Sequence, residues 1–270
     1  MKFELLVSTM HKSVDDVKKM LVKMNVHCDC LVINQCDEEN YYEEIINNKF
    51  ILRVFSTKER GLSNSRNMAL NNARADIVGI ADDDLYYYDN FDKTILDYYD
   101  NNPKADLVMF NIDNYKKKYS NNDKRLSFFK CFGFSSVQVT IKIKSIINKG
   151  ISFNTYFGTG SGIINSGEEN IFLKECIKKK CKMFYCSKKI LKNEESASSW
   201  FNGYSDTKYL KDRGAIFYEM SNTFFLLLVL QFAIRKRKLF YPIKIITAIK
   251  YMVEGKRNYV NYTLKDLLKD

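Results

Sequence analysis

The stretch GLSNSRNMALNNARADIVGIADDD, residues 61–84, decides the fold of this chain. Its first part has apolar residues at helical spacing after a glycine, which predicts a helix over residues 61–75. The apolar run DIVGIA, residues 76–81, then predicts a buried strand, and three consecutive aspartates follow it. The stretch therefore predicts a helix, a strand and a strongly charged strand end in direct succession.

The rest of the N-terminal half repeats this alternation. Apolar runs predict further strands, and a polar stretch with Ser13 as its N-cap predicts another helix. The strands are expected at residues 2–9, 28–37, 50–56 and 105–112, and the helix at residues 13–24. Strands that alternate with helices over about 110 residues predict an α/β fold with a mostly parallel, doubly wound sheet. Ligands bind at the carboxyl ends of the strands in such sheets, which is where the aspartates lie.

Composition narrows the class of protein only loosely. The chain has 270 residues, a formal net charge of +11 and 46% hydrophobic residues, which suits one large domain with an appendage. The N-terminal run FELLVST contains a glutamate and is expected to be a strand, not a signal peptide. Seven cysteines without CxxC spacing favour reduced, buried thiols over a zinc site.

Asp82, Asp83 and Asp84 admit two interpretations. Aspartates are common in solvated turns at strand ends, so the triplet by itself carries no function. Alternatively it holds a cation, because carboxylates at positions i and i+2 of an extended segment point the same way. Mg²⁺ or Mn²⁺ takes such oxygen ligands together with substrate phosphates.

The segment before the predicted helix favours the second interpretation. Arg60, Arg66 and Asn67 surround Gly61 at a loop-to-helix junction. Free amides at a helix N-terminus, with arginine beside them, bind anions. An anion cradle and a carboxylate cluster at one strand end together predict a site for a nucleotide diphosphate and its metal.

These motifs resemble a known family. The N-terminal strand, LVINQCD (31–37), the block 60–84 and GEEN (167–170) together resemble the inverting family 2 glycosyltransferases with a GT-A fold, most closely bacterial enzymes that build surface polysaccharides. The resemblance covers residues 1–215. It implies a catalytic domain over these residues, with a nucleotide-sugar-binding half at 1–115 and an acceptor-binding half at 116–215.

The resemblance also implies the donor site. The donor is expected to be a nucleotide-diphospho-sugar, usually a UDP-sugar, with Mn²⁺ or Mg²⁺ on a DXD-type motif. Asp84 is the expected main metal ligand, with Asp82 beside it. The donor-binding residues implied are Ser8, Thr9, Gln35, Asp37, Arg60, Arg66, Asn67, Asp82, Asp83 and Arg213. The second strand ends in NQCD instead of the family's acidic-plus-glycine turn, which leaves the choice of uridine over another nucleoside open.

The GEEN motif supplies the expected catalytic base. Inverting transfer is a single displacement, so a base must take the proton of the acceptor hydroxyl. The family usually has a Glu–Asp pair here and uses its second member, which implies Glu169 first and Glu168 in reserve. The alternative is that both acids only complement a helix dipole. Gly160 and Trp200 are implied on the acceptor side. A buried aromatic explains Trp200 equally well, and a surface arginine explains Arg213 equally well.

The C-terminal residues 216–270 are expected to form a basic helical extension. Residues 223–234 are almost wholly apolar, but about 18 Å of helix is too short to cross a membrane. RKRK follows at 235–238, and one helical arc then carries Ile245, Ile246, Ile249, Met252 and Val253. We expect this extension to lie on an anionic membrane surface, or else to pack on the catalytic domain. Membrane docking would suit a cytoplasmic enzyme, peripheral at the inner face of the cell membrane.

Three functions remain open at this stage. The first is a metal-dependent, inverting hexosyltransferase that passes a sugar to a glycan or lipid-linked glycan in capsule or lipopolysaccharide-type biosynthesis. The second is a nucleotidyltransferase that makes a nucleotide-sugar, but LLVSTMHKSV (5–14) lacks the glycine-rich loop such enzymes carry after the first strand. The third is a non-enzymatic basic protein that binds membrane or nucleic acid. Its charge should form one stripe with interleaved aromatics, which this sequence does not show, so no nucleic-acid partner is expected.

Overall fold

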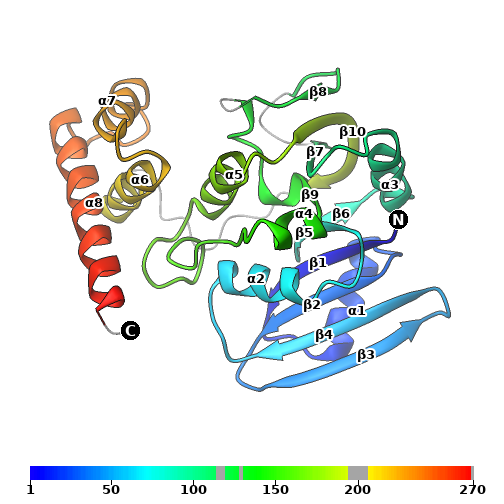
Figure 1. The fold of residues 1–270 in the computed structure, drawn as a ribbon. Helices are drawn as coiled ribbons and strands as arrows, with labels where there is room; N and C mark the ends of the chain where they lie inside the picture. The colour runs from blue at the N-terminus through cyan, green and yellow to red at the C-terminus, as the bar shows by residue number, and fades with distance from the viewer. Residues whose placement is uncertain (114–118, 128–129, 194–205, 269–270) are drawn as a thin grey trace. The chain divides into compact units, whose positions relative to one another are not determined.

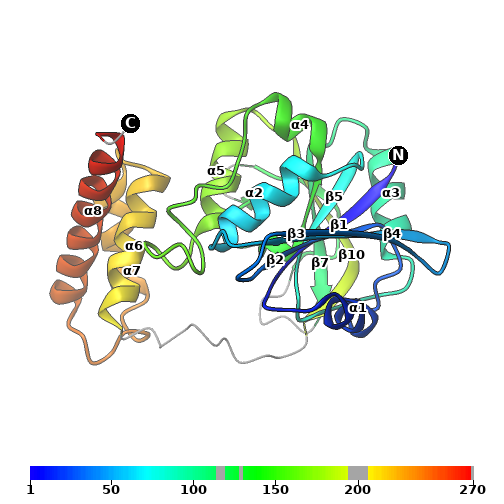
Figure 2. The same ribbon diagram turned by 90° about the horizontal axis from the view of Figure 1, so that it is seen from below.

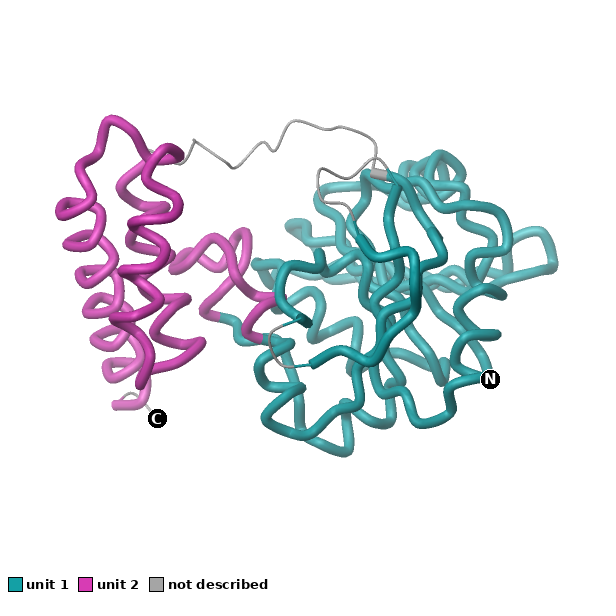
Figure 3. Tube along the Cα trace, turned by 90° about the horizontal axis from the view of Figure 1, so that it is seen from above, with its two compact units in different colours: residues 1–155, 172–197 teal, residues 156–171, 198–270 magenta. Residues whose placement is uncertain are grey.

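The computed structural model describes residues 1–113, 119–127, 130–193 and 206–268 (Figure 1). The chain divides into two compact units, which Figure 3 shows in different colours. Unit 1 comprises residues 1–155 and 172–197, and unit 2 comprises residues 156–171 and 198–270.

Unit 1 is built on a ten-stranded sheet formed by the described residues. Its strands are β1 (Phe3–Met10), β2 (Cys30–Gln35), β3 (Asn40–Ile46), β4 (Phe50–Thr57), β5 (Ile77–Asp82), β6 (Leu85–Tyr87), β7 (Leu107–Asp113), β8 (Lys124–Arg125), β9 (Val139–Lys142) and β10 (Met183–Asn193). Their order is β3-β4-β2-β1-β5-β9-β7-β10-β6, and β8 also pairs with β10. The neighbours β4, β2, β1 and β5 are parallel, as the sequence predicted.

The sheet as a whole is mixed, which corrects the prediction of a mostly parallel one. β9 runs antiparallel between β5 and β7, and β3 pairs with β4 antiparallel. A tight turn explains β3: Asn47 and Asn48 both have positive φ, at 51° and 55°, which suits a short hairpin. The prediction missed β3 because this edge strand has no fully buried residue and two glutamates interrupt its apolar residues.

Helices cover both faces of this sheet. They are α1 (Val14–Lys23), α2 (Leu62–Asn72), α3 (Phe91–Asn101), α4 (Ile143–Asn148) and α5 (Glu168–Lys178), with a short 3-10 turn, η2, at Ser136–Gln138. Leu5 and Val7 of β1 pack into the core shared with α1 and α3, whereas Leu6 packs into the core shared with α2, α4 and α5. Figure 2 shows α1 on one side of the sheet and α2 and α4 on the other. The predicted doubly wound arrangement is therefore confirmed.

Two chain turns match the expected local signals. Ser13 caps α1, since its hydroxyl accepts a hydrogen bond of 3.1 Å from the Asp16 amide. Gly61 precedes α2 with φ of 106°, a conformation that side chains disfavour. This glycine lets the chain leave β4 and enter α2 directly.

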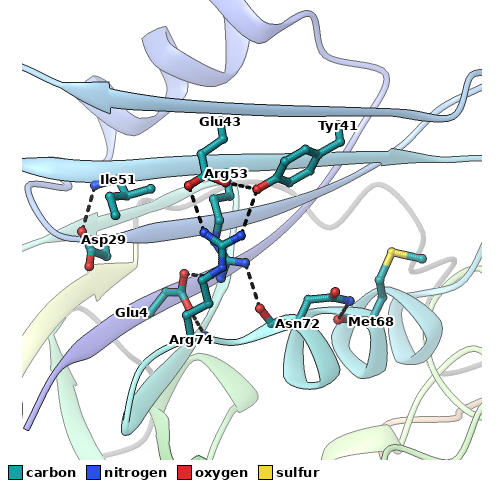
Figure 4. Close-up of polar contacts among 9 residues, drawn as sticks. All are labelled: Glu4, Asp29, Tyr41, Glu43, Ile51, Arg53, Met68, Asn72 and Arg74. Carbon is teal, nitrogen blue, oxygen red and sulfur yellow. Dashed lines mark hydrogen bonds and ion pairs between the residues drawn. The ribbon is translucent and has the colours of Figure 1, made fainter.

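A buried ion pair ties three elements of unit 1 together (Figure 4). Arg53 on β4 lies 2.6 Å from Glu4 on β1, and both side chains are almost wholly buried. Arg53 also donates to the carbonyl of Asn72 at the end of α2, and Glu4 accepts from the Arg74 amide. The pair therefore fixes the end of α2 against the parallel strands.

Three helices lie wholly among the described residues of unit 2: α6 (Thr207–Met220), α7 (Phe225–Arg235) and α8 (Ile245–Leu267). Helix α5 begins in unit 2 at Glu168 and continues in unit 1 from Phe172. A Cβ at Gly214 of α6 would overlap the backbone of Met252, and one at Gly255 of α8 would overlap the backbone of Lys211. These glycines let the two helices approach closely. The expected domain boundary at residue 215 therefore falls inside α6, which belongs with the C-terminal helices.

The apolar arc expected on α8 faces the inside of unit 2. Met252 is fully buried, and Ile245, Ile249 and Val253 pack against the same cluster as α6 and α7. Only Ile246 is largely exposed, at 70%. The expectation that this arc lies on a membrane is therefore wrong, because the arc packs against neighbouring helices. No helix in the described part of the chain is long and apolar enough to cross a membrane.

Candidate active site

The carboxyl ends of four parallel strands meet at one edge of unit 1. Pairing of β1 with β5 sets Ser8 opposite Asp82, and pairing of β1 with β2 sets Thr9 opposite Asn34. β2 and β4 then bring Gln35 beside Thr57. Register alone therefore gathers several predicted donor-binding residues at this edge.

The aspartate triplet lies beside protein cations. Asp83 accepts a hydrogen bond of 2.5 Å from the Thr9 hydroxyl, and its carboxylate lies 3.6 Å from Lys12 Nζ. Asp82 lies 3.2 Å from Arg66 Nη2 and is 41% exposed, and Asp84 is exposed in the turn between β5 and β6. Lys12 and Arg66 therefore place positive charge beside two of the three carboxylates, which offsets the repulsion between them.

Arg66 is the most deeply buried cation of the site. Its side chain is 3% exposed, donates to the Ser136 hydroxyl at 2.8 Å, and lies 5.5 Å from the centre of the Phe153 ring. Asn67 holds Phe153 in place through two hydrogen bonds to its backbone, of 2.9 and 2.7 Å. The guanidinium therefore has a fixed position beside Asp82.

Gln35, Asp37 and Arg60 shape the loop that leads into α2. Gln35 Oε1 accepts a hydrogen bond of 2.7 Å from the Gly61 amide. Arg60 donates to the backbone carbonyls of residues 36, 57 and 58, and lies 2.6 Å from Asp37. These side chains therefore stabilise the loop through contacts within the protein, independently of any ligand.

Sequence reasoning missed some residues of this edge. The Lys12 amide and carbonyl both bond to the Asn34 side chain, which fixes the loop after β1 beside Asp83. A lysine directly after the first strand is a signal that could have found Lys12. Ser136 and Phe153 had no such signal, because they lie about 70 and 86 residues along the chain from Arg66 and Asn67.

The carboxylates fit a hard divalent cation only in company with other oxygens. No three His, Cys, Asp or Glu side chains of the described residues form a group that could hold a metal. Mg²⁺ commonly takes one or two carboxylates and completes its shell with substrate phosphates and water. The exposed carboxylates of Asp82 and Asp84 match that donor set when a diphosphate is present.

The remaining predicted residues belong to unit 2. Glu168 and Glu169 begin α5, where Glu168 is buried and Glu169 is half-buried. Gly160 is exposed with φ of 77°, and Arg213 of α6 lies 4.9 Å from the centre of the Tyr209 ring. The Nε of Arg213 is buried without a hydrogen-bond partner among the described residues. Trp200 lies outside the described residues.

Several solved structures of TarS from S. aureus have the same fold as this chain. The chain is similar to the crystal structure of TarS 1-349, with a TM-score of 0.59 and 15% identity, over 96% of this chain and 89% of that one. It is similar to the complex of TarS 1-349 with UDP-GlcNAc, with a TM-score of 0.58 and 15% identity, over 97% and 79% of the two chains. It is also similar to the complex of TarS 1-349 with UDP, with a TM-score of 0.58 and 14% identity, over 98% of this chain and 92% of that one. Identity this low shows a shared fold.

The mixed sheet and its covering helices give this chain the same fold as the TarS structures. A family model described as "Glycosyl transferase family 2" matches residues 7–166, more than half of the chain. The chain therefore belongs to glycosyl transferase family 2. The matched range contains the aspartate triplet and ends one residue before GEEN. A search of curated proteins found no match.

Proposed function

We propose that this chain is a metal-dependent, inverting hexosyltransferase. It moves a sugar from a nucleotide-diphospho-sugar to a glycan or lipid-linked glycan in surface-polysaccharide biosynthesis. The observation that carries the proposal is the strand edge where Asp82 and Asp83 lie beside Arg66 and Lys12. The TarS complexes with UDP-GlcNAc and UDP share this fold, which supports a UDP-sugar as the donor.

In this proposal the strand edge of unit 1 binds the donor. Arg66 would contact the diphosphate through its preorganised guanidinium, and Asp84 and Asp82 would hold Mn²⁺ or Mg²⁺. The bound cation would stabilise the negative charge of the leaving diphosphate. The other donor-binding residues proposed are Ser8, Thr9, Gln35, Asp37, Arg60, Asn67, Asp83 and Arg213.

The chain's own base then activates the acceptor. Glu169 takes the proton of the acceptor hydroxyl, whose oxygen bonds to the anomeric carbon as the bond to the diphosphate oxygen breaks. One displacement inverts the anomeric configuration. Glu169 is preferred to Glu168 because it is the second acid of the pair, the position that the family resemblance implies for the base. Gly160 and Trp200 are proposed on the acceptor side.

A thermal-shift experiment tests the donor site. UDP and a panel of UDP-sugars are added with Mn²⁺ or with EDTA, to the wild type, to Asp84→Ala and to Asp15→Ala. Asp15 is an exposed aspartate on α1 and serves as the control. Ligand at a hundredfold excess over Kd should stabilise the wild type by about 2.7 kcal/mol with Mn²⁺. Asp84→Ala should lose this shift and Asp15→Ala should keep it. No shift with any nucleotide would overturn the proposal.

A second experiment tests the base. Glu169→Gln should lower turnover by about 10²–10⁴-fold while donor binding persists. Retained transfer would move the base to Glu168 or elsewhere, and the anomeric configuration of the product, read by NMR, decides between inversion and retention. Release of diphosphate from a nucleoside triphosphate and a sugar 1-phosphate would instead support the nucleotidyltransferase alternative.

A lipid-linked acceptor would place this enzyme in the cytoplasm at the inner face of the cell membrane. Such an acceptor diffuses in the plane of the lipid. The proposed function therefore calls for a surface of the protein that binds a membrane.

A further inference from the structure

Helix α7 is apolar on two sides, and only one of them is buried. Phe225, Val229 and Ala233 pack into the core that α7 shares with α6 and α8. The adjacent side carries Leu226, Leu227, Leu230 and Ile234, which are 63%, 62%, 46% and 60% exposed. Their spacing places these four residues on one arc of the helix.

Exposed apolar residues also flank this arc. Phe224, at the helix start, is 60% exposed, and Leu239 and Tyr241, in the turn after the helix, are 40% and 80% exposed. Single exposed leucines are ordinary, but a group that forms one patch marks an interaction site. We call Phe224, Leu226, Leu227, Leu230 and Ile234 the α7 surface.

All charged residues in the segment that contains and follows the α7 surface are basic. Residues 223–250 contain six Lys and Arg and no Asp or Glu, and the four at 235–238 are all exposed. Clustered lysine is depleted from the cores of protein interfaces, whereas basic residues beside an apolar helix face are typical of helices that lie on anionic lipid. The charge therefore identifies the partner as a membrane.

We propose that the α7 surface docks on an anionic lipid membrane. The apolar arc enters the boundary between headgroups and acyl chains, and Arg235–Lys238 contact the anionic headgroups. An 11-residue helix is about 16 Å long, so it lies in the plane of the membrane and does not cross it. α8, whose apolar arc is buried, supports α7 from within unit 2.

Vesicle co-sedimentation of the full chain tests the apolar part. Leu227→Glu/Leu230→Glu should reduce the bound fraction on mixed phosphatidylcholine–phosphatidylglycerol vesicles by about tenfold or more. Val22→Glu/Ile45→Glu is the matched control, since these two apolar residues are 76% and 62% exposed on α1 and β3. Equal binding by both double variants would overturn the proposal. Circular dichroism checks that each variant keeps its helices.

A charge variant tests the lipid chemistry. Each basic residue near an anionic surface strengthens binding by about fivefold, so Arg237→Gln/Lys238→Gln should weaken it by about 25-fold. Lys19→Gln/Lys178→Gln is the control, with side chains 80% and 70% exposed in unit 1. Binding that is equally strong on pure phosphatidylcholine vesicles would overturn the proposed role of anionic lipid. If the wild type forms a dimer in solution and Leu227→Glu/Leu230→Glu dissociates it, the partner of the α7 surface is a second copy of this chain. That result would overturn the proposal of membrane docking.

The biological role of the α7 surface rests on the proposed function, but the vesicle-binding test does not depend on that function. Leu227→Glu/Leu230→Glu should keep the metal-dependent shift with UDP while it loses vesicle binding. A wild-type chain that binds vesicles but no nucleotide would refute the proposed function and leave the docking surface standing. A chain that binds nucleotide but not vesicles would refute only the docking surface.

Discussion

Arg53→Met should destabilise unit 1 much more than Arg74→Met, although both arginines pair with a glutamate in the same region (Figure 4). Arg53 and Glu4 are 2.6 Å apart with side chains 2% and 4% exposed, whereas Arg74 and Glu43 are 2.9 Å apart with side chains 58% and 36% exposed. The two pairs therefore differ mainly in burial.

The magnitude follows from that burial. Methionine fills much of the arginine's volume but leaves the Glu4 carboxylate without its cation in the interior. Removing one partner of a buried pair costs about 3–5 kcal/mol. The Asn72 carbonyl at the end of α2 also loses its donor. The Arg74 pair is solvated, so its loss should barely change stability.

Denaturant unfolding followed by circular dichroism measures both effects. The free energy of unfolding should fall by about 3–5 kcal/mol for Arg53→Met. Adding Glu4→Leu to Arg53→Met should recover part of the loss, with an interaction energy of about 1–3 kcal/mol. A loss below about 1 kcal/mol for Arg53→Met, or equal losses for both arginines, would refute the assignment of a buried ion pair.

Two further predictions concern packing and a thiol. Gly255→Ala should destabilise unit 2 by about 1–3 kcal/mol, because the new Cβ would meet the Lys211 backbone. Lys250→Ala, on the exposed side of α8, is the control and should leave the stability unchanged. Equal melting temperatures for the two variants would contradict the close approach of α6 and α8. The pKa of Cys181 is lowered, chiefly by a hydrogen bond from Cys176, so its alkylation by iodoacetamide should rise with pH at lower pH than for an ordinary thiol. Cys176→Ala should move that rise to higher pH, and an unchanged rate profile would argue against the contact.

The local pattern of the sequence was sufficient for the parallel part of the fold. Apolar runs identified β1, β2, β4, β5 and β7, and a helical stripe with an N-terminal glycine identified α2. These signals are local, because a strand or helix buries side chains at its own period. The same runs placed the aspartate triplet at the end of β5.

The partners of the site residues could not be read from the sequence. Contacts such as those of Arg66 with Ser136 and of Thr9 with Asp83 join segments about 70 residues apart. Likewise β9 enters the sheet antiparallel between β5 and β7, and no local pattern specifies a strand's neighbour. The charged side chains of the site therefore come together only in the assembled sheet.

The two apolar helices of unit 2 show the same division. By itself the sequence determined that residues 223–234 are almost wholly apolar and that residues 242–257 carry one apolar helical arc, with four basic residues between the two segments. Only the tertiary structure decided that the α8 arc is buried against α6 and α7 while one side of α7 stays exposed. An apolar stripe on a helix is expected to pack against another apolar surface. The close approach of α6 and α8 at two glycines determines that the α8 stripe is buried within the protein.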